Sequence, residues 1–149
     1  MEIINREARF NYFIEEELEC GISLSGTEIK AIRDGKANLK DSYAIVRNNE
    51  IFLLNMYIGE YKEGNLFNHD PRRTRKLLLH KKEIIKFSQN IEREGYTLIP
   101  LKLYFVKNKA KILLGLGKGK KTFDKRETIK QRELKREADK LHKYNYKYG

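Results

Sequence analysis

The sequence has 149 residues and a net charge of +11, from 32 Lys/Arg against 21 Asp/Glu. That length fits one domain, or one domain with a tail, and the charge excess favours a polyanionic partner such as nucleic acid or an anionic membrane. No apolar run approaches the roughly 18 residues of a membrane span, and the N-terminus lacks an apolar signal region, so we expect a cytoplasmic protein.

The first half of the chain predicts a strand, a helix and a hairpin. Bulky residues alternate along residues 8–19, which is typical of a half-buried strand. Ser25 and Glu28 have the spacing of a helix capping box, and Gly35 suits the end of that helix. Residues 42–58 contain two apolar runs separated by Asn48 and Asn49, which suit a tight turn.

The second half predicts a surface loop, a helix and two more strands. Residues 59–75 are polar and rich in turn formers, and residues 77–95 then predict a helix with Ile84, Phe87 and Ile91 on one face. Residues 97–117 predict two long strands joined near residues 107–109, and Pro100 within the first indicates an edge or a bulge. The sequence therefore predicts a mainly β fold with short helices, arranged as a small barrel.

The character of the chain changes near residue 118. Residues 118–149 carry 12 Lys/Arg against 5 Asp/Glu, a net charge of +7, whereas residues 1–117 carry only +4. We interpret residues 1–117 as a globular RNA-binding domain and residues 118–149 as a basic C-terminal tail. Asp124 and Glu127 have capping-box spacing, but apolar residues are sparse, so we expect a tail that is disordered when free and helical on a polyanionic partner. A permanently helical tail is the alternative.

Residues 117–130, GKGKKTFDKRETIK, resemble a phosphate-binding loop only superficially. The P-loop pattern requires Ser or Thr after Gly-Lys, but Lys121 follows Gly119 and Lys120. The stretch offers instead five cations around one aromatic ring, Phe123. Flexible glycines let such a segment approach a phosphate chain, and an aromatic ring among cations can stack on an unpaired base. The alternative is that Phe123 anchors the tail to the globular domain.

A second basic cluster precedes the predicted helix at residues 77–95. Its cations are Arg72, Arg73, Arg75, Lys76, Lys81 and Lys82. Closely spaced arginines favour contact with a phosphate backbone, because guanidinium groups hold phosphate by paired hydrogen bonds. Leu77, Leu78 and Leu79 follow, and either all three are buried or at least one is exposed at a binding surface.

The sequence offers no catalytic or metal-binding constellation. Cys20 is a lone cysteine that we interpret as a small packed residue. The three histidines are far apart and lack the spacing of zinc ligands. The carboxylates at residues 15–17 suit solvation or ion pairing. We therefore expect no enzymatic activity and no cofactor.

Several long motifs resemble one family, small protein B, the tmRNA-binding protein of bacterial trans-translation. They are NREARFNYFI, GISLSGTEIKAIRDGKANLKDSYA, NHDPRRTRKLLLHKKEI, EGYTLIPLKLYF and GLGKGKKTFDKRETIK, and together they cover roughly residues 5 to 136. The resemblance implies a closed β-barrel related to the OB-fold, with flanking helices. It also implies binding to the tRNA-like domain of tmRNA, which is delivered with elongation factor Tu to stalled ribosomes.

The resemblance also implies functional residues, position by position. Glu19, Leu78 and His80 match positions important for tmRNA binding, and the same motifs contain the cations Lys30, Arg33, Arg73, Arg75 and Lys76. His80 stands where the family often has asparagine, and Glu7 where a basic residue is common. Both are departures from the family pattern.

In the tail, the resemblance implies residues that act on the small ribosomal subunit, in the decoding centre and the empty mRNA channel. They are Lys118, Lys120, Lys121, Phe123, Asp124, Lys125, Arg126 and, in a looser alignment, Leu141. Tyr144, Tyr146 and Tyr148 follow no family pattern and suit either RNA stacking or a frayed terminus. A general RNA-binding module and a metal-dependent nuclease are the competing functions, and the tail lacks the apolar face that membrane binding requires.

Overall fold

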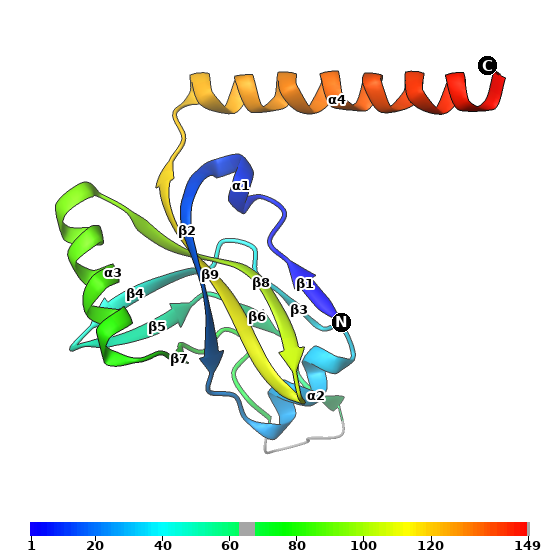
Figure 1. Ribbon diagram of the computed structural model, residues 1–149. Coiled ribbons are helices and arrows are strands. Elements are labelled where there is room, and N and C mark those ends of the chain that lie inside the picture. The colour runs from blue at the N-terminus through cyan, green and yellow to red at the C-terminus, as the bar shows by residue number, and fades with distance from the viewer. Residues whose placement is uncertain (63–67, 149) are drawn as a thin grey trace. The chain divides into compact units, whose positions relative to one another are not determined.

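The structure is a computed structural model that describes residues 1–62 and 68–148. Within these ranges it describes all side chains except those of residues 92–94, 122 and 141–148. The chain divides into two compact units, unit 1 (Met1–Gly119) and unit 2 (Lys120–Gly149). The elements of unit 1 are β1 (Glu2–Ile4), α1 (Ala8–Asn11), β2 (Tyr12–Ile22), α2 (Gly26–Arg33), β3 (Ala37–Asn38), β4 (Tyr43–Arg47), β5 (Glu50–Leu54), β6 (Tyr57–Ile58), β7 (Arg75–Leu78), α3 (Lys81–Glu94), β8 (Thr97–Val106) and β9 (Lys109–Gly119) (Figure 1). The predicted mainly β fold with short helices is confirmed.

The main sheet closes on itself. Within the described residues its strand order is β1-β8-β4-β5-β7-β2-β9, and β8 also pairs with β9, so that six of these seven strands form a ring with β1 added to β8. Neighbouring strands are antiparallel throughout, with the longest ladders between β2 and β9 and between β8 and β9. β3 and β6 form a separate short pair.

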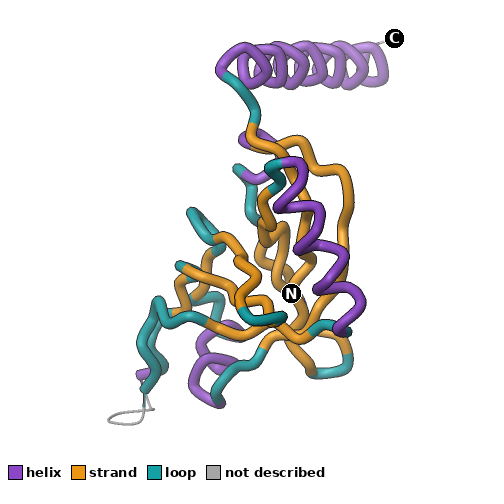
Figure 2. The backbone as a smooth tube through the Cα atoms, turned by 90° about the vertical axis from the view of Figure 1, so that its left-hand side faces the viewer, coloured by secondary structure: helices purple, strands orange, loops and turns teal. Residues whose placement is uncertain are grey.

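Successive side chains of a strand point to opposite faces of the sheet, so every second side chain points into the ring and contributes to the core. In β5, for example, Ile51 and Leu53 are buried, whereas the residues between and beside them are partly exposed. α3 lies along one side of the strands (Figure 2) and buries Ile84 and Phe87 in the same core, with Ile91 packed against it. The predicted apolar face of this helix is confirmed.

Local sequence signals determine several boundaries. The Ser25 hydroxyl accepts from the Glu28 N–H and the Glu28 carboxylate accepts from the Ser25 N–H, which is the predicted capping box of α2. Asn48 and Asn49 have φ of 52° and 60°, and Arg47 pairs with Glu50, so these asparagines form the predicted hairpin turn. The register of β8 shifts between Pro100 and Lys102, which is the predicted bulge.

Two elements differ from the prediction. Residues 8–11 form the short helix α1, so that the first long strand begins at Tyr12 rather than at residue 8. Residues 75–78 form the strand β7 where we expected loop and helix, and α3 begins only at Lys81. The reason is long-range pairing, since Leu77 pairs with Ile51 on β5 and with Ile22 on β2.

Unit 2 contains α4 (Thr122–Tyr148). The Asp124 carboxylate accepts from the Lys121 N–H at 3.3 Å, so Asp124 lies in the first turn rather than at the N-cap position that its spacing indicated. Lys118 and Gly119 belong to β9, so the predicted domain boundary at residue 117 lies two residues inside unit 1. The structure shows a helix where we expected disorder in the free protein; a transition on binding stays a prediction.

Gly115 and Gly117 of β9 lie against a second, smaller apolar cluster. Its buried residues are Ala8, Ile99 and Leu101, with Tyr12, Ile14 and Leu113 packed against them. A Cβ at Gly117 would lie 3.0 Å from both the Phe13 carbonyl oxygen and Ile14 Cδ1, whereas a Cβ at Gly119 would meet no atom within 4 Å. We expect Gly117→Ala to destabilise the protein by about 1–3 kcal/mol through overpacking. Gly119→Ala, the matched control, is expected to stay within about 0.5 kcal/mol of the wild type. Urea denaturation of both variants tests this, and equal stabilities would contradict it.

Candidate nucleic-acid interface

A groove of about 570 Å³ lies between the end of β2, β7 and the start of α3. We call it the Leu78 groove. Its lining residues are Glu19, Cys20, Gly21, Asn49, Glu50, Lys76, Leu77, Leu78, Leu79, His80, Lys81, Glu83, Ile84 and Lys111. Four of the residues predicted to bind tmRNA therefore lie on one surface: Lys76, Leu78 and His80, which are close in sequence, and the distant Glu19.

Leu78 is exposed because β7 alternates. Arg75 and Leu77 point into the core, whereas Lys76 and Leu78 point outward. Leu78 retains 51% of its accessible surface, and its neighbour across the strands is Gly21, whose missing side chain leaves room for the leucine. The alternative in which all three leucines are buried is therefore wrong, and a binding surface at Leu78 stays a prediction. An exposed leucine beside cations suits contact with a base or ribose.

Glu19 lies on the outward face of β2 and accepts a hydrogen bond from the Tyr104 hydroxyl. Burial, together with this hydrogen bond and the negative charge of Glu19, holds the pKa of Tyr104 well above its ordinary value. Glu19 is thus oriented by Tyr104, and its remaining lone pairs face solvent, where a base or a ribose hydroxyl can donate to them.

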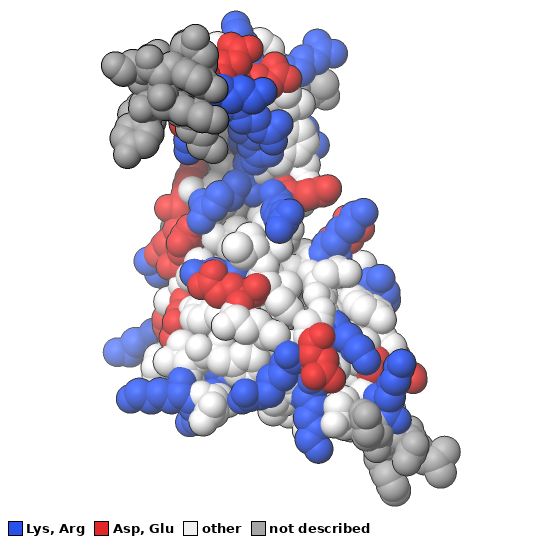
Figure 3. Space-filling view, turned by 90° about the vertical axis from the view of Figure 1, so that its right-hand side faces the viewer, with Lys and Arg blue, Asp and Glu red and all other residues white. Residues whose placement is uncertain are grey.

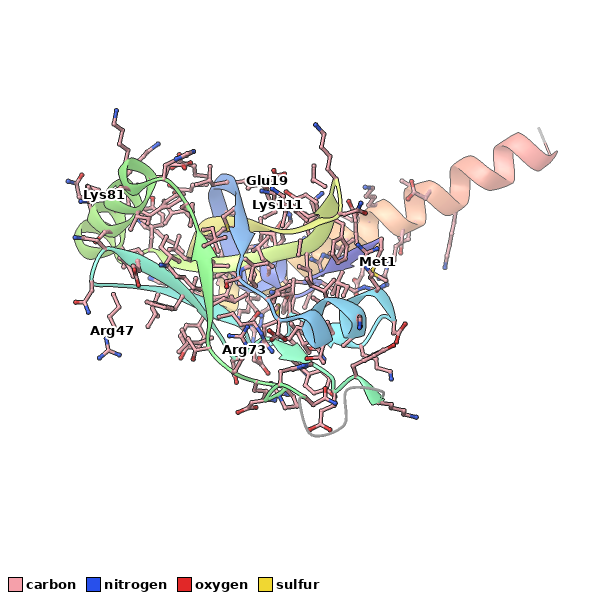
Figure 4. The ribbon with its side chains drawn as sticks, turned by 90° about the horizontal axis from the view of Figure 1, so that it is seen from below. Met1, Glu19, Arg47, Arg73, Lys81 and Lys111 are labelled. Carbon is pink, nitrogen blue, oxygen red and sulfur yellow. The ribbon has the colours of Figure 1, made fainter. Side chains whose placement is uncertain are left out.

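The groove contains two further cations, of which Lys81 belongs to the second basic cluster of the sequence and Lys111 was not predicted. Lys81 begins α3, and Lys111 lies on β9 beside the end of β2; both line the groove, and Figure 4 labels them with Glu19. The alternation of Lys109 and Lys111 along a predicted strand was the available signal for Lys111. His80 precedes α3, where its N–H donates to the Glu83 carboxylate at 3.2 Å. The His80 side chain is exposed and lines the groove.

Arg75 does not contribute to this surface, contrary to the prediction. Its side chain is fully buried and donates to the Glu28 carboxylate, to the Met56 carbonyl (2.6 Å) and to the Pro71 carbonyl (3.1 Å). A guanidinium with these partners has no surface left for phosphate. Arg75 therefore joins α2 to the chain segment that precedes β7, and its role is structural.

Arg73 also donates hydrogen bonds to the Glu28 carboxylate. Its Nε donates to Glu28 at 3.0 Å and its Nη2 to the Ser23 carbonyl at 3.2 Å, and 36% of its side chain is exposed. Burial alone raises the pKa of Glu28, but hydrogen bonds from Arg73, the Ser25 N–H and Arg75 outweigh it and hold that pKa below its ordinary value. Glu28 is therefore ionised and fully partnered inside the protein.

Lys30 and Arg33 lie on α2 and do not line the Leu78 groove. Lys30 Nζ lies 5.4 Å from the centroid of the Tyr61 ring, and the Arg33 guanidinium carbon lies 4.7 Å from that of Phe105. Both side chains remain exposed. These cation–aromatic pairs make α2 a separate cationic surface beside the groove.

The predicted tail residues are divided between the two units. In unit 1, Lys118 Nζ lies 4.7 Å from the Tyr96 ring centroid. In unit 2, Lys120 donates to the Thr128 hydroxyl at 2.8 Å, and Phe123 retains 76% of its accessible surface. Lys121 and Arg126 are exposed, Asp124 and Lys125 are half-buried, and the side chain of Leu141 lies outside the described residues.

Comparison with known proteins determines the family. The profile of the SmpB protein family matches residues 2–144. The chain belongs to this family. It is 57% identical to the SsrA-binding protein of Halalkalibacterium halodurans over 91% of this chain and 88% of that protein. It is 56% identical to the SsrA-binding protein of Staphylococcus haemolyticus over 95% and 91% of the two chains.

A solved structure described as "tmRNA-SmpB: a journey to the center of the bacterial ribosome" contains a chain with the same fold. Its TM-score is 0.70 at 46% identity, and the match covers 86% of this chain and 94% of the other. The SmpB family predicted from the sequence motifs is therefore confirmed.

The charge of this SmpB family member is distributed rather than concentrated in one pocket. On the face shown in Figure 3, Lys and Arg side chains surround a largely uncharged area with a few carboxylates between them. Within residues 1–62 and 68–148 the described side chains include no group of three or more His, Cys, Asp or Glu able to hold a metal ion. No helix among the described residues is both long and apolar enough to cross a membrane.

The buried Glu28 carboxylate makes a testable contribution to stability. We expect Glu28→Gln to lower the free energy of unfolding by about 3–5 kcal/mol at neutral pH, because it leaves buried arginine charge unpaired. The folded pKa of Glu28 is depressed, so its contribution is present above the unfolded pKa of about 4.3 and is lost as pH falls toward the folded value. Urea denaturation as a function of pH measures both effects.

Glu17→Gln is the matched control, since Glu17 pairs with Arg9 on the surface. Its effect is expected to be at most about 1 kcal/mol. Equal losses in the two variants, or an unchanged acid dependence in Glu28→Gln, would show that the buried network does not stabilise the fold in this way.

Proposed function

We propose that this chain binds the tRNA-like domain of tmRNA and delivers it to stalled ribosomes for trans-translation, as an RNA-binding protein without enzymatic activity or cofactor. The observation that carries the proposal is the convergence of Glu19, Leu78 and His80 on one cation-bordered groove. The SsrA-binding proteins that match it over nearly its whole length support the same conclusion.

The Leu78 groove suits a folded RNA. Lys76, Lys81 and Lys111 supply charge for phosphates, and the exposed Leu78 supplies an apolar contact. Glu19 accepts a hydrogen bond from a base or a ribose hydroxyl, which phosphate contacts alone do not provide. Recognition then rests on the shape of the RNA and on contacts to its backbone and ribose groups. Lys30, Arg33 and the exposed part of Arg73 extend the cationic surface over α2 and the adjoining segment.

The tail acts in a second step, on the small ribosomal subunit. Lys118, Lys120, Lys121, Lys125 and Arg126 approach ribosomal RNA, with Asp124 stabilising the start of α4. The exposed ring of Phe123 is suited to stacking on a base of the decoding centre. The helix, including Leu141, then occupies the empty mRNA channel and replaces codon–anticodon pairing.

The finer assignments belong to the same proposal. We take the closed ring of strands to be a small barrel related to the OB-fold, which presents RNA-binding surfaces on its outside. We place residues 118–149 together as the functional tail although β9 continues to Gly119. Elongation factor Tu is the expected partner in the delivery complex, and the cytoplasm is the expected location.

Removing unit 2 separates the two steps. A chain ending at Gly119 keeps β9 intact, and we expect it to bind the tRNA-like domain nearly as well as the full chain, because the Leu78 groove is unchanged. Tagging of a stalled nascent chain in a reconstituted translation system is expected to be lost. Loss of specific binding itself, or equal competition by ordinary tRNA, would indicate a general basic RNA binder instead.

Leu78 tests the groove directly. Leu78→Ala removes the exposed apolar contact and is expected to weaken binding of the tRNA-like domain by about tenfold, equivalent to about 1.4 kcal/mol. Val106→Ala is the matched control, because Val106 is also an exposed aliphatic residue but does not line the groove. Fluorescence titration compares the two, and similar dissociation constants would remove Leu78 from the interface.

A further inference from the structure

The ring of strands is weakest between β4 and β8. These two strands share a single residue pair, Ala44 with Leu98, whereas β4 pairs with β5 at every position from Tyr43 to Arg47. Beyond Ala44, the described strands offer β4 no further partner on its β8 side. The junction therefore leaves space that neither strand fills.

A pocket of about 360 Å³ occupies this junction. We call it the β4–β8 pocket. It is lined by Tyr43, Ala44, Ile45, Val46, Ser88, Ile91, Tyr96, Thr97 and Leu98. It shares no lining residue with the Leu78 groove, because α3 contributes its first residues to the groove and Ser88 and Ile91 to the pocket. Its volume lies within the range of about 300–1,000 Å³ that is usual for small ligand sites.

The lining combines aromatic walls with a few hydroxyl groups. Tyr43 keeps 42% of its surface accessible, and Tyr96 forms another wall. Ser88 and Thr97 add hydroxyl donors and acceptors to surroundings that are otherwise apolar. A heterocycle has a π face and a polar edge, so a nucleobase matches this lining better than an aliphatic side chain does.

Charged groups that contact the Tyr96 wall indicate which molecule carries that heterocycle. Lys118 Nζ lies 4.7 Å from the Tyr96 ring centroid, and Lys118 pairs across the strands with Phe13, an exposed aromatic residue. The Tyr96 hydroxyl donates to the Glu15 carboxylate, which fixes the ring and places negative charge on that side. Neither Lys118 nor Glu15 lines the pocket itself, but both contact its Tyr96 wall, and of these two groups Lys118 is the one that can hold a phosphate attached to the base.

We infer that the β4–β8 pocket binds an unpaired base of small-subunit ribosomal RNA, stacked on Tyr43 with its phosphate beside Lys118. The inference rests on the proposed function, which brings this chain to the ribosome. The pocket is then a second RNA contact, independent of the Leu78 groove. Lys118 is also one of the residues proposed to act with the tail. The pocket therefore contacts ribosomal RNA in the same step as the tail.

The test uses the full chain and a fluorescent oligoadenylate of about six nucleotides, a length typical of single-strand sites. Tyr43→Ala is expected to weaken oligonucleotide binding by about tenfold, the loss expected for one stacked base. Tyr43→Phe keeps the ring and is expected to bind like the wild type. Tyr43→Ala is also expected to weaken binding to isolated small subunits while leaving binding to the tRNA-like domain and the melting temperature unchanged.

Backbone amide NMR locates the contact. Addition of the oligonucleotide is expected to shift the signals of Ser88 and Thr97 and to leave those of Leu78 and His80 in place. The inference is overturned if Tyr43→Ala binds the oligonucleotide like the wild type, or if only the Leu78 groove responds. It is equally overturned if Ser88 and Thr97 respond to protein concentration rather than to RNA, because a second copy of the chain then covers the junction.

Failure of this inference is distinguishable from failure of the proposed function. If the wild-type chain does not bind the tRNA-like domain, the proposed function fails, whereas the oligonucleotide titration still reports on the pocket. If the tRNA-like domain binds normally and Tyr43→Ala changes neither oligonucleotide nor small-subunit binding, only the pocket assignment fails.

Discussion

The ion pairs and hydrogen bonds of the buried Glu28 carboxylate with Arg73 and Arg75 are the interaction on which the arrangement of the Leu78 groove depends. An ionised carboxylate is costly to bury unless hydrogen bonds replace its water shell. Here the Ser25 N–H, Arg73 and Arg75 supply those bonds. Arg75 then extends the network to the Met56 and Pro71 carbonyls. Among the described side chains, no buried nitrogen or oxygen is left without a partner.

This network also determines which side chains of β7 face solvent. Because Arg75 points inward to meet Glu28, the alternation of β7 places Lys76 and Leu78 outward. The same strand lies between β2 and β5, so the outward residues of β7 stand beside Glu19 on one side and Glu50 on the other. A basic motif that appears uniform in sequence thus separates into buried and exposed residues, and only the exposed ones are available to the proposed RNA contact.

Unit 1 and unit 2 also differ in how their apolar and charged side chains are exposed. Unit 1 buries an extensive apolar core and carries its cations at separate positions on the surface. In unit 2, the described side chains from residue 129 to residue 140 are exposed, Ile129 and Leu134 among them. A helix this polar gains little from packing, so a polyanionic surface is the partner that stabilises it most. The β4–β8 pocket and Lys118 lie in unit 1 but share the chemistry proposed for the tail.

The sequence by itself determined what depends on neighbouring residues. It determined the capping box at Ser25 and Glu28, the turn at Asn48 and Asn49, the buried face of α3 and the long family motifs, because each signal lies within a few positions of the chain. Through the family resemblance it also predicted Glu19, Leu78 and His80 as tmRNA-binding residues, which stays a prediction.

Only the tertiary structure decided what depends on distant pairing. β7 is a strand because β2 and β5 lie on either side of it, although its leucines read locally as the start of a helix. Arg75 is buried because Glu28, 47 residues away, needs a counter-charge. Lys81 and Lys111 meet in one groove through the closure of the ring. No local pattern specifies these outcomes, because the free energy that selects them comes from contacts between segments far apart in sequence.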